Sequence, residues 1–368
     1  MRILSLYLIL ILHCTIIIAQ EKKWMLGPFV RMSEEPIISP DSNFVFIDPI
    51  TNSIVNWSSM ATFNPAATIK KDSMIIIYRS EEKLNSKIIG GHRSRLGMAS
   101  TTDGIKLNHY PYPIFYPDND LQINNEWPGG VEDPRIVKSE DGIYFMTYTQ
   151  WNRKIPRLAL ASSEDLFNWT KYGPIFKNWK EGKYNMIESK SGAIITELKN
   201  NELYAAKING KYWMYYGVPN IWMAYSEDLI NWIPLEDNLG NRIKVLSPRL
   251  GYFDNWLVEA GPPPIITDDG IVCLYNAGNR NRDRDRDKSL VNNSYSAGQA
   301  LFDKSEPWKL LDRSTKPFLK PELEFEKKGQ YISGTTFIEG IVYFNKKWFL
   351  FYGAADNFVG VVVTVDNE

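Results

Sequence analysis

The chain has 368 residues and a formal net charge of −1, and 13% of it is aromatic, including 12 tryptophans. This length allows a sizeable core and by itself permits two domains. The near-zero charge argues against a nucleic-acid partner, which normally requires an excess of basic residues. The aromatic content is typical of sugar-binding sites and equally of β-rich cores, so both alternatives stay open.

The N-terminal stretch "MRILSLYLILILHCTIIIAQ" has one arginine followed by an almost unbroken apolar run. It predicts a signal peptide over residues 1–19 and a secreted or periplasmic protein. A retained anchor is the alternative, because Ile17, three positions from the expected cleavage site, is not small. The rest of the chain has no second apolar segment long enough to span a bilayer. We therefore expect residues 20–368 to form the mature protein, with no membrane span.

Along the mature chain, an aromatic-rich strand recurs, each time with a short apolar segment before it and another strand after it. Short runs of β-branched and aromatic residues between Gly, Asn and Asp are typical of β-strands, and no stretch shows a long helical period. The aromatic strands are expected at residues 73–82, 142–151, 211–220, 270–279 and 347–356. The fourth contains Cys273, for which we expect a buried thiol.

This strand–turn–strand–turn–strand unit occurs five times. Repeated antiparallel sheets without alternating helices favour a propeller over a sandwich. The sequence therefore predicts an all-β fold, a five-bladed β-propeller that forms a single catalytic domain over residues 20–368.

The first segments of the units are "ATFNPAATIK", "VEDPRIVKSE", "KSGAIITELK", "EAGPPPIITD" and "GTTFIEGIVYF". In a propeller the innermost strands surround a central channel, so polar residues at the start of these segments should meet at one mouth. They include Asn64, Asp133, Lys190 with Glu188 just before it, and Glu259. A polar pocket is therefore expected there, rather than a set of unrelated turns.

Several separated motifs carry a family resemblance. The motifs "FNPAAT", "YRSEE", "HRSRLGMASTTDG", "GGVEDPRI", "YFMTYTQW", "ESKSGAI", "VEAGPPPI" and "YGAAD" follow one another from about residue 30 to the C-terminus. Together they resemble glycoside hydrolase family 130, whose members are five-bladed propellers acting on β-mannosides. The family includes phosphorylases, which cleave with phosphate, and inverting hydrolases, which use water. The resemblance implies a mannose-containing oligosaccharide or glycan as the partner.

The resemblance also implies roles for particular residues. Asp133 matches a catalytic aspartate credited with donating a proton through a sugar hydroxyl, and Glu259 matches a glutamate associated with the hydrolases. Asn64, Arg79, Arg95 and Asp356 match residues of the mannose-binding pocket. With Glu132, Arg135 and Lys190, which come from the polar segments described above, they form the expected substrate-binding set. In the hydrolases a second glutamate is expected near the end of the third aromatic strand, where this chain has Val218.

Inverting hydrolysis needs two carboxyl groups about 6.5–9.5 Å apart, one protonated and one ionised. The candidates are Asp133, Glu259 and Glu188. Arg135 would keep a carboxylate ionised if it turned inward, or it would pair with a neighbouring blade.

Two rival functions stay open beside a secreted inverting hydrolase acting on β-1,2- or β-1,4-mannosidic linkages. A phosphorylase would need a cationic phosphate clamp, for which only Lys190 and Arg153 stand out. A weakly active glycan-binding propeller would fit the loss of a carboxylate at Val218. The charged run "NRNRDRDRDK" alternates in sign and is expected to be a solvated loop. No metal-ligand spacing is visible, so no metal or other cofactor is expected.

Overall fold

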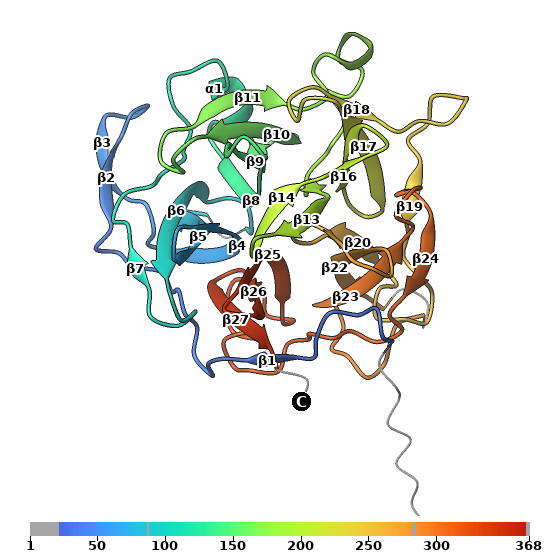
Figure 1. Ribbon diagram of the computed structural model, residues 1–368. Helices are drawn as coiled ribbons and strands as arrows, with labels where there is room; N and C mark the ends of the chain where they lie inside the picture. Colours follow the sequence, from blue (N-terminus) through green and yellow to red (C-terminus); the bar gives the residue numbers. More distant parts are fainter. Residues whose placement is uncertain (1–21, 87, 282–284, 366–368) are drawn as a thin grey trace, which may run out of the picture.

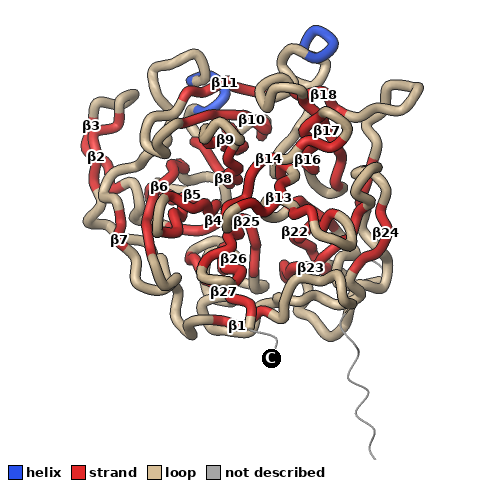
Figure 2. Tube along the Cα trace, in the orientation of Figure 1, coloured by secondary structure: helices blue, strands red, loops and turns tan. Residues whose placement is uncertain are grey.

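The structure is a computed structural model that describes residues 22–86, 88–281 and 285–365. The predicted signal peptide and part of the charged run at 279–288 lie outside these residues. Figure 1 shows short antiparallel sheets arranged around a common centre. Strands dominate the described residues, and α1 (Ile123–Glu126) and a 3₁₀ turn (Trp179–Gly182) are the helices among them. Figure 2 shows how little of the chain they occupy. The all-β prediction is confirmed.

The strands form successive groups in chain order, and each predicted aromatic segment overlaps one long strand of its group, namely β5, β9, β16, β22 or β26. The first group is β4 (Ala61–Lys70), β5 (Ser73–Glu82), β6 (Arg93–Thr101) and β7 (Asn108–His109). The second is β8 (Gly130–Lys138), β9 (Tyr144–Trp151), β10 (Pro156–Ser163) and β11 (Thr170–Pro174). The third contains β12 (Ala193–Ile194), β15 (Lys207–Ile208), β16 (Lys211–Tyr216), β17 (Ile221–Ser226), β18 (Trp232–Pro234) and β19 (Lys244–Leu246).

The fourth group comprises β20 (Leu257–Ala260), β21 (Ile265–Ile266), β22 (Ile271–Asn279), β23 (Ser294–Phe302) and β24 (Leu310–Arg313). The last comprises β25 (Thr336–Phe344), β26 (Lys347–Ala354), β27 (Phe358–Thr364) and, from the other end of the chain, β1 (Phe29–Arg31). Two further hairpins are β2 (Val45–Asp48) with β3 (Ser53–Asn56), which forms a sheet of its own, and β13 (Thr196–Lys199) with β14 (Glu202–Ala205). The second hairpin joins its neighbours through parallel pairs of β14 with β8 and of β13 with β21. The sequence missed β2, β3, β14 and the outermost strands.

Two of the predicted first segments are interrupted. Residues 190–199 split into β12, which pairs with β16, and β13, which pairs with β14. Residues 259–268 split into β20 and β21 around three consecutive prolines. Proline has no N–H to donate to a ladder, so the strand stops directly after Ala260. That break lies immediately beyond Glu259.

The hydrophobic core lies between neighbouring groups. Successive side chains of a strand point to opposite faces, and β5 shows this plainly. Its Ile75 and Ile77 pack with the second group, whereas Met74 and Ile76 pack with the last group. Because both faces of the inner strands are covered, these strands read as nearly continuous apolar runs. Cys273, on β22, is one of the buried residues, as predicted.

The two ends of the described chain meet in one sheet. Strand β1 pairs antiparallel with β27, with Phe29 opposite Thr364. Arg31 extends the contact, because its guanidinium binds the fully buried carboxylate of Glu326 at 2.7 Å and that of Glu322 at 2.8 Å. In the part of the chain that the structure describes, no helix is long and apolar enough to cross a bilayer.

Candidate active site

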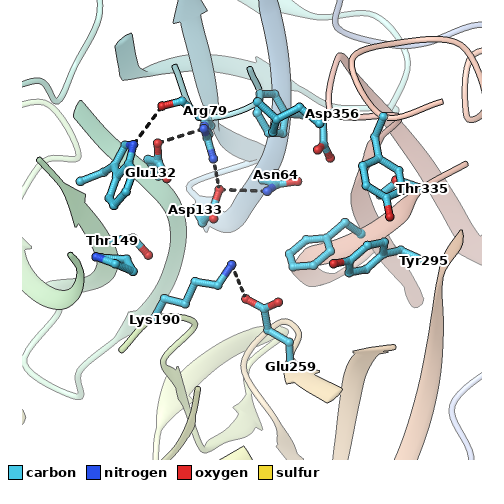
Figure 3. Close-up of a pocket in the computed structure, with 17 residues that line it drawn as sticks. Asn64, Arg79, Glu132, Asp133, Thr149, Lys190, Glu259, Tyr295, Thr335 and Asp356 are labelled. Atoms are coloured by element: carbon cyan, nitrogen blue, oxygen red, sulfur yellow. Dashed lines mark hydrogen bonds and ion pairs between the residues drawn. The ribbon is translucent and has the colours of Figure 1, made fainter. Parts of the chain in front are cut away.

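A cavity of about 350 Å³ opens where the inner strands of the groups converge. Figure 3 shows its polar side chains pointing toward one another from separate strands. Its polar and charged lining residues are Asn64, Arg79, Glu132, Asp133, Thr149, Lys190, Glu259, Thr335 and Asp356. Its aromatic lining residues are Phe63, Trp151, Tyr295, Tyr331 and Phe337. A pocket with aromatic walls and a few converging polar groups is the usual form of a small-molecule site.

Local backbone irregularities turn two of the predicted residues into the cavity. The pairing of β4 with β5 shifts register at Asn64, and that of β8 with β9 shifts at Asp133. Both residues have positive φ, 48° and 52°, and both precede a proline. Such bulges re-aim a side chain and are common beside active sites. Gly353 leaves room for the first one, because a Cβ there would lie 2.3 Å from Asn64 Oδ1.

Arg79, on β5, organises the acidic side of the cavity. Its Nη1 donates to Asp133 Oδ1 at 3.1 Å, and its Nη2 lies 2.7 Å from Glu81 Oε1 and 2.9 Å from Glu132 Oε1. The guanidinium also lies over the Phe63 ring, 4.5 Å from its centroid. Burial opposes its charge, but these carboxylates together raise the pKa of Arg79. It is therefore a fixed cation with its donors already engaged.

The pKa values of Glu132 and Asp133 shift in opposite directions, although the two residues are neighbours. Burial raises the pKa of Glu132 to about 7, which Arg79 opposes and the Asp133 charge reinforces. For Asp133 burial is outweighed by Arg79, Lys190 and the hydrogen bond from Asn64 Nδ2 at 2.9 Å, so its pKa falls below the usual range. Because neighbouring acids titrate as a unit, the Glu132–Asp133 pair holds one proton up to about pH 7.

On another side of the cavity, Lys190 and Ser191 hold Glu259. The Lys190 ammonium lies 3.1 Å from Glu259 Oε1, and the Ser191 hydroxyl donates to the same oxygen. Burial disfavours the ammonium, but Glu259 and Asp133 together raise the pKa of Lys190. Among the described residues, nothing hydrogen-bonds the other oxygen of Glu259. One carboxylate oxygen is thus fixed while the second is free to accept a proton.

Asp356 completes the set of acids. It follows β26, with a φ of 52°, and burial raises its pKa to about 7, opposed by Arg79. Its backbone carbonyl accepts a hydrogen bond from Gln330, whose amide also binds Glu81 at 2.8 Å. Asp356 is therefore held at the cavity by groups that the sequence alone did not single out.

Three buried polar atoms on the cavity wall lack a hydrogen-bond partner among the described residues: Asn64 Oδ1, Thr149 Oγ1 and Thr335 Oγ1. A buried polar atom left unpaired is costly.

Several of the residues singled out in the sequence, Arg153 among them, do not line the cavity. Arg95 is fully buried away from the cavity, where it binds Asp48 and Glu82. Arg135 is buried without lining the cavity, and Glu188 is exposed. Val218 is half-buried and is likewise not part of the lining.

Sequence reasoning missed most of the uncharged wall, such as Thr149, Tyr295 and Thr335, and the fully buried Glu339. Thr149 falls within the motif "YFMTYTQW" and Thr335 lies at the start of the segment "GTTFIEGIVYF", so both could have been indicated, whereas Tyr295 stands in no marked pattern. In the described part of the chain, no group of three or more His, Cys, Asp or Glu residues is arranged to hold a metal ion.

Comparison with known proteins places this site in context. A protein-family model described as beta-1,4-mannooligosaccharide phosphorylase matches residues 30–368. The chain is 30% identical over 337 residues to a 1,2-beta-oligomannan phosphorylase of Thermoanaerobacter sp. (strain X514), across 90% of this chain and 96% of that relative.

Solved structures are more similar in sequence. A glycosyl hydrolase from Bacteroides ovatus is 48% identical, with a TM-score of 0.90, over 93% of this chain and 95% of that one. The same values hold for a structure described by the words "The GH130 family of mannoside phosphorylases contains glycoside hydrolases that target beta-1,2 mannosidic linkages in Candida mannan".

Proposed function

The chain belongs to glycoside hydrolase family 130, and from this premise we propose that it is a secreted enzyme that hydrolyses β-mannosidic linkages with inversion. The substrate is a mannose-containing oligosaccharide, and the β-1,2 linkage is the first candidate. One solved structure that is 48% identical to this chain is described with that linkage. The aromatic walls of the cavity and its polar lining residues suit a ligand with many hydroxyl groups.

The charged residues that line the cavity favour water over phosphate as the nucleophile. Among the described residues that line it, the cations are Arg79 and Lys190, and carboxylates already bind both. Four acids line the same space, namely Glu132, Asp133, Glu259 and Asp356. A phosphate dianion needs cationic donors free to bind it and would be repelled here. Water, as the attacking nucleophile, needs only a base that takes its proton.

We assign the two roles that inversion requires to opposite sides of the cavity. Glu259, with one oxygen held by Lys190 and Ser191, takes a proton from the attacking water through its free oxygen. The Glu132–Asp133 pair supplies the proton that the leaving oxygen needs, because it keeps one near neutral pH. Inversion follows if the water attacks the face of the sugar opposite the leaving group. Glu188, exposed and outside the cavity, takes neither role.

The fold proposal follows from the packing. The five strand groups cover one another in succession, and one hydrophobic cluster joins the last group to the first. We propose that these groups are the blades of one five-bladed propeller, formed by residues 20–368 after removal of residues 1–19.

Phosphorolysis is the second candidate, since curated relatives at 24–30% identity are phosphorylases. The test is incubation with β-1,2- and β-1,4-mannobiose, with and without inorganic phosphate. We expect free mannose at the same rate in both conditions, released initially as the α-anomer in the NMR spectrum. Mannose 1-phosphate, formed only when phosphate is present, would establish the second candidate instead.

A further inference from the structure

Arg135 connects the two strands that carry Asp133 and Glu259. It lies on β8, is 2% exposed and does not line the cavity. Its Nη1 donates to the backbone carbonyl of Asp133 at 3.1 Å. Its Nη2 and Nε donate to the carbonyls of Ala260 and Gly261, both at 2.8 Å. One guanidinium therefore spans from the bulge at Asp133 to the residue that directly follows Glu259.

We propose that Arg135, held in place by Glu339, is a positioning residue that fixes the separation between Asp133 and Glu259. This inference rests on the proposed function for its catalytic consequence. In inverting hydrolysis the distance between the two carboxyl groups decides whether a water fits between them. Here that distance is set through backbone carbonyls, so Arg135 acts without touching the substrate.

Glu339 is the acidic partner of Arg135; burial raises the pKa of its carboxyl group, and Arg135 opposes that rise. It lies on β25, at a register shift between Ile338 and Gly340, and is fully buried. Its Oε1 is 2.9 Å from Arg135 Nη2, and neither of its oxygens has a hydrogen bond to any other described residue. Among the described residues, the carboxyl group of Glu339 therefore has Arg135 as its polar partner. Through this ion pair, strands from three groups, β8, β20 and β25, converge on one side chain.

The chemistry of the contact requires arginine. The planar guanidinium presents donors in a fixed fork and reaches three carbonyls and a carboxylate at once. A lysine ammonium is a point charge on a flexible stem and cannot reproduce this geometry. Replacing Arg135 by lysine keeps the charge while removing the fork, which isolates the positioning effect.

The test compares Arg135→Lys with Arg313→Lys. Arg313 is also buried, and it binds Asp254 and a backbone carbonyl away from the cavity, so it controls for the loss of a buried arginine. A displacement of about 1 Å can cost on the order of 100-fold in rate. We expect Arg135→Lys to lower kcat on β-mannobiose by about that factor with KM little changed, and Arg313→Lys to leave kcat per folded molecule unaltered. A raised KM with unchanged kcat in Arg135→Lys would overturn the proposal, because it would mean direct substrate binding.

Crystal structures of wild type and Arg135→Lys provide a readout that is independent of turnover. The distance between the Asp133 and Glu259 carboxyl groups should change by roughly 1 Å, and an unchanged distance would overturn the proposal. If the wild type is inactive on every β-mannoside, the proposed function is refuted. The distance between the Asp133 and Glu259 carboxyl groups still tests the positioning role of Arg135 in that case. If Arg135→Lys does not fold, Glu339→Gln takes its place. It should lower kcat on the order of 10-fold at constant KM, and full activity in that variant would equally overturn the proposal.

Discussion

At the scale of single residues, the motifs predicted which positions belong to the site. Which of those side chains face the cavity depends on how side chains alternate between the two faces of each strand. Asn64, Arg79 and Asp133 were expected at the site and line the cavity. Arg95 was expected there too, yet its guanidinium is engaged with Asp48 and Glu82 outside the cavity. Glu339 was overlooked because one acid in an apolar strand gives no recognisable pattern; its partner Arg135 comes from a strand 204 residues away in the chain.

Replacing Asp133 by asparagine tests the acid pair most directly. The amide keeps the shape of the side chain and its oxygen can still accept from Asn64, so the fold should remain intact. Loss of a proton-handling group should lower the turnover of β-mannobiose by about 10²–10⁴-fold. Thermal unfolding should show a melting temperature close to that of the wild type. Wild-type turnover in this variant would remove Asp133 from the mechanism.

The pH profile tests which group holds the proton. Below about pH 7 the Glu132–Asp133 pair is protonated, and above it the proton is lost, so kcat/KM of the wild type should fall as pH rises through 7. In Glu132→Gln the remaining acid, Asp133, has a lowered pKa, and the alkaline limb should move to lower pH. Asp356→Asn is the comparison, because burial raises the pKa of Asp356 to about 7 as well. If the limb disappears in Asp356→Asn and stays in Glu132→Gln, the assignment is wrong.

At the scale of elements, the long inner strands were predictable because both of their faces are buried and their residues are β-branched or aromatic. The outer strands were not, since they are short and partly exposed, as Leu310 and Leu311 on β24 show. The hairpin of β2 and β3 was missed for the same reason: its Ile47 and Ile54 are 67% and 73% exposed. Its attachment depends on a buried ion pair between Asp48 and Arg95.

That ion pair predicts a stability effect where the sequence had suggested substrate binding. Arg95→Met would leave the buried carboxylate of Asp48 without its counter-ion, which typically costs about 3–5 kcal/mol. Urea denaturation should show this loss, while KM and kcat per folded molecule stay at wild-type values. Lys309→Met is the control, because its pair with Glu306 is exposed and should contribute little. An increase in KM without a loss of stability would restore the substrate-binding interpretation.

At the scale of the whole molecule, the recurrence of the strands could be predicted from the sequence, whereas the pairing of the first strand with the last could not. The fivefold recurrence of the aromatic strand indicated a propeller. Residues 29–31, however, contain no pattern that predicts their pairing with the last strand. The pairing depends on groups far apart in the sequence, notably Arg31 on β1 and Glu326. Glu326 also accepts a hydrogen bond from the Tyr352 hydroxyl at 2.7 Å, so this contact joins β1 to β26 as well.

Arg31→Ala tests this pairing of β1 with β27. The buried Glu326 carboxylate would lose its charged partner, and a hydrogen bond between charged groups typically contributes about 1.5–3 kcal/mol. We expect a lower melting temperature, together with faster hydrogen exchange of the β1 and β27 amides. Lys328→Ala removes an exposed pair with Glu324 and should change neither property. Equal stability of the two variants would show that Arg31 does not hold the ends together.

The pairing of β1 with β27 also has a consequence for engineering. During synthesis β1 appears first and has no partner until residue 364 has been made, so this pairing is a contact of maximal sequence separation and should fold slowly. Near its two ends the chain runs side by side, with the amide of Val365 donating to the carbonyl of Pro28 at 3.2 Å. A circular permutant that joins these two residues through a short turn, and therefore omits residues 22–27, would convert the pairing of β1 with β27 into an ordinary hairpin. Opened in the exposed loop around residue 239, such a permutant should refold faster than the natural chain and keep its cavity unchanged.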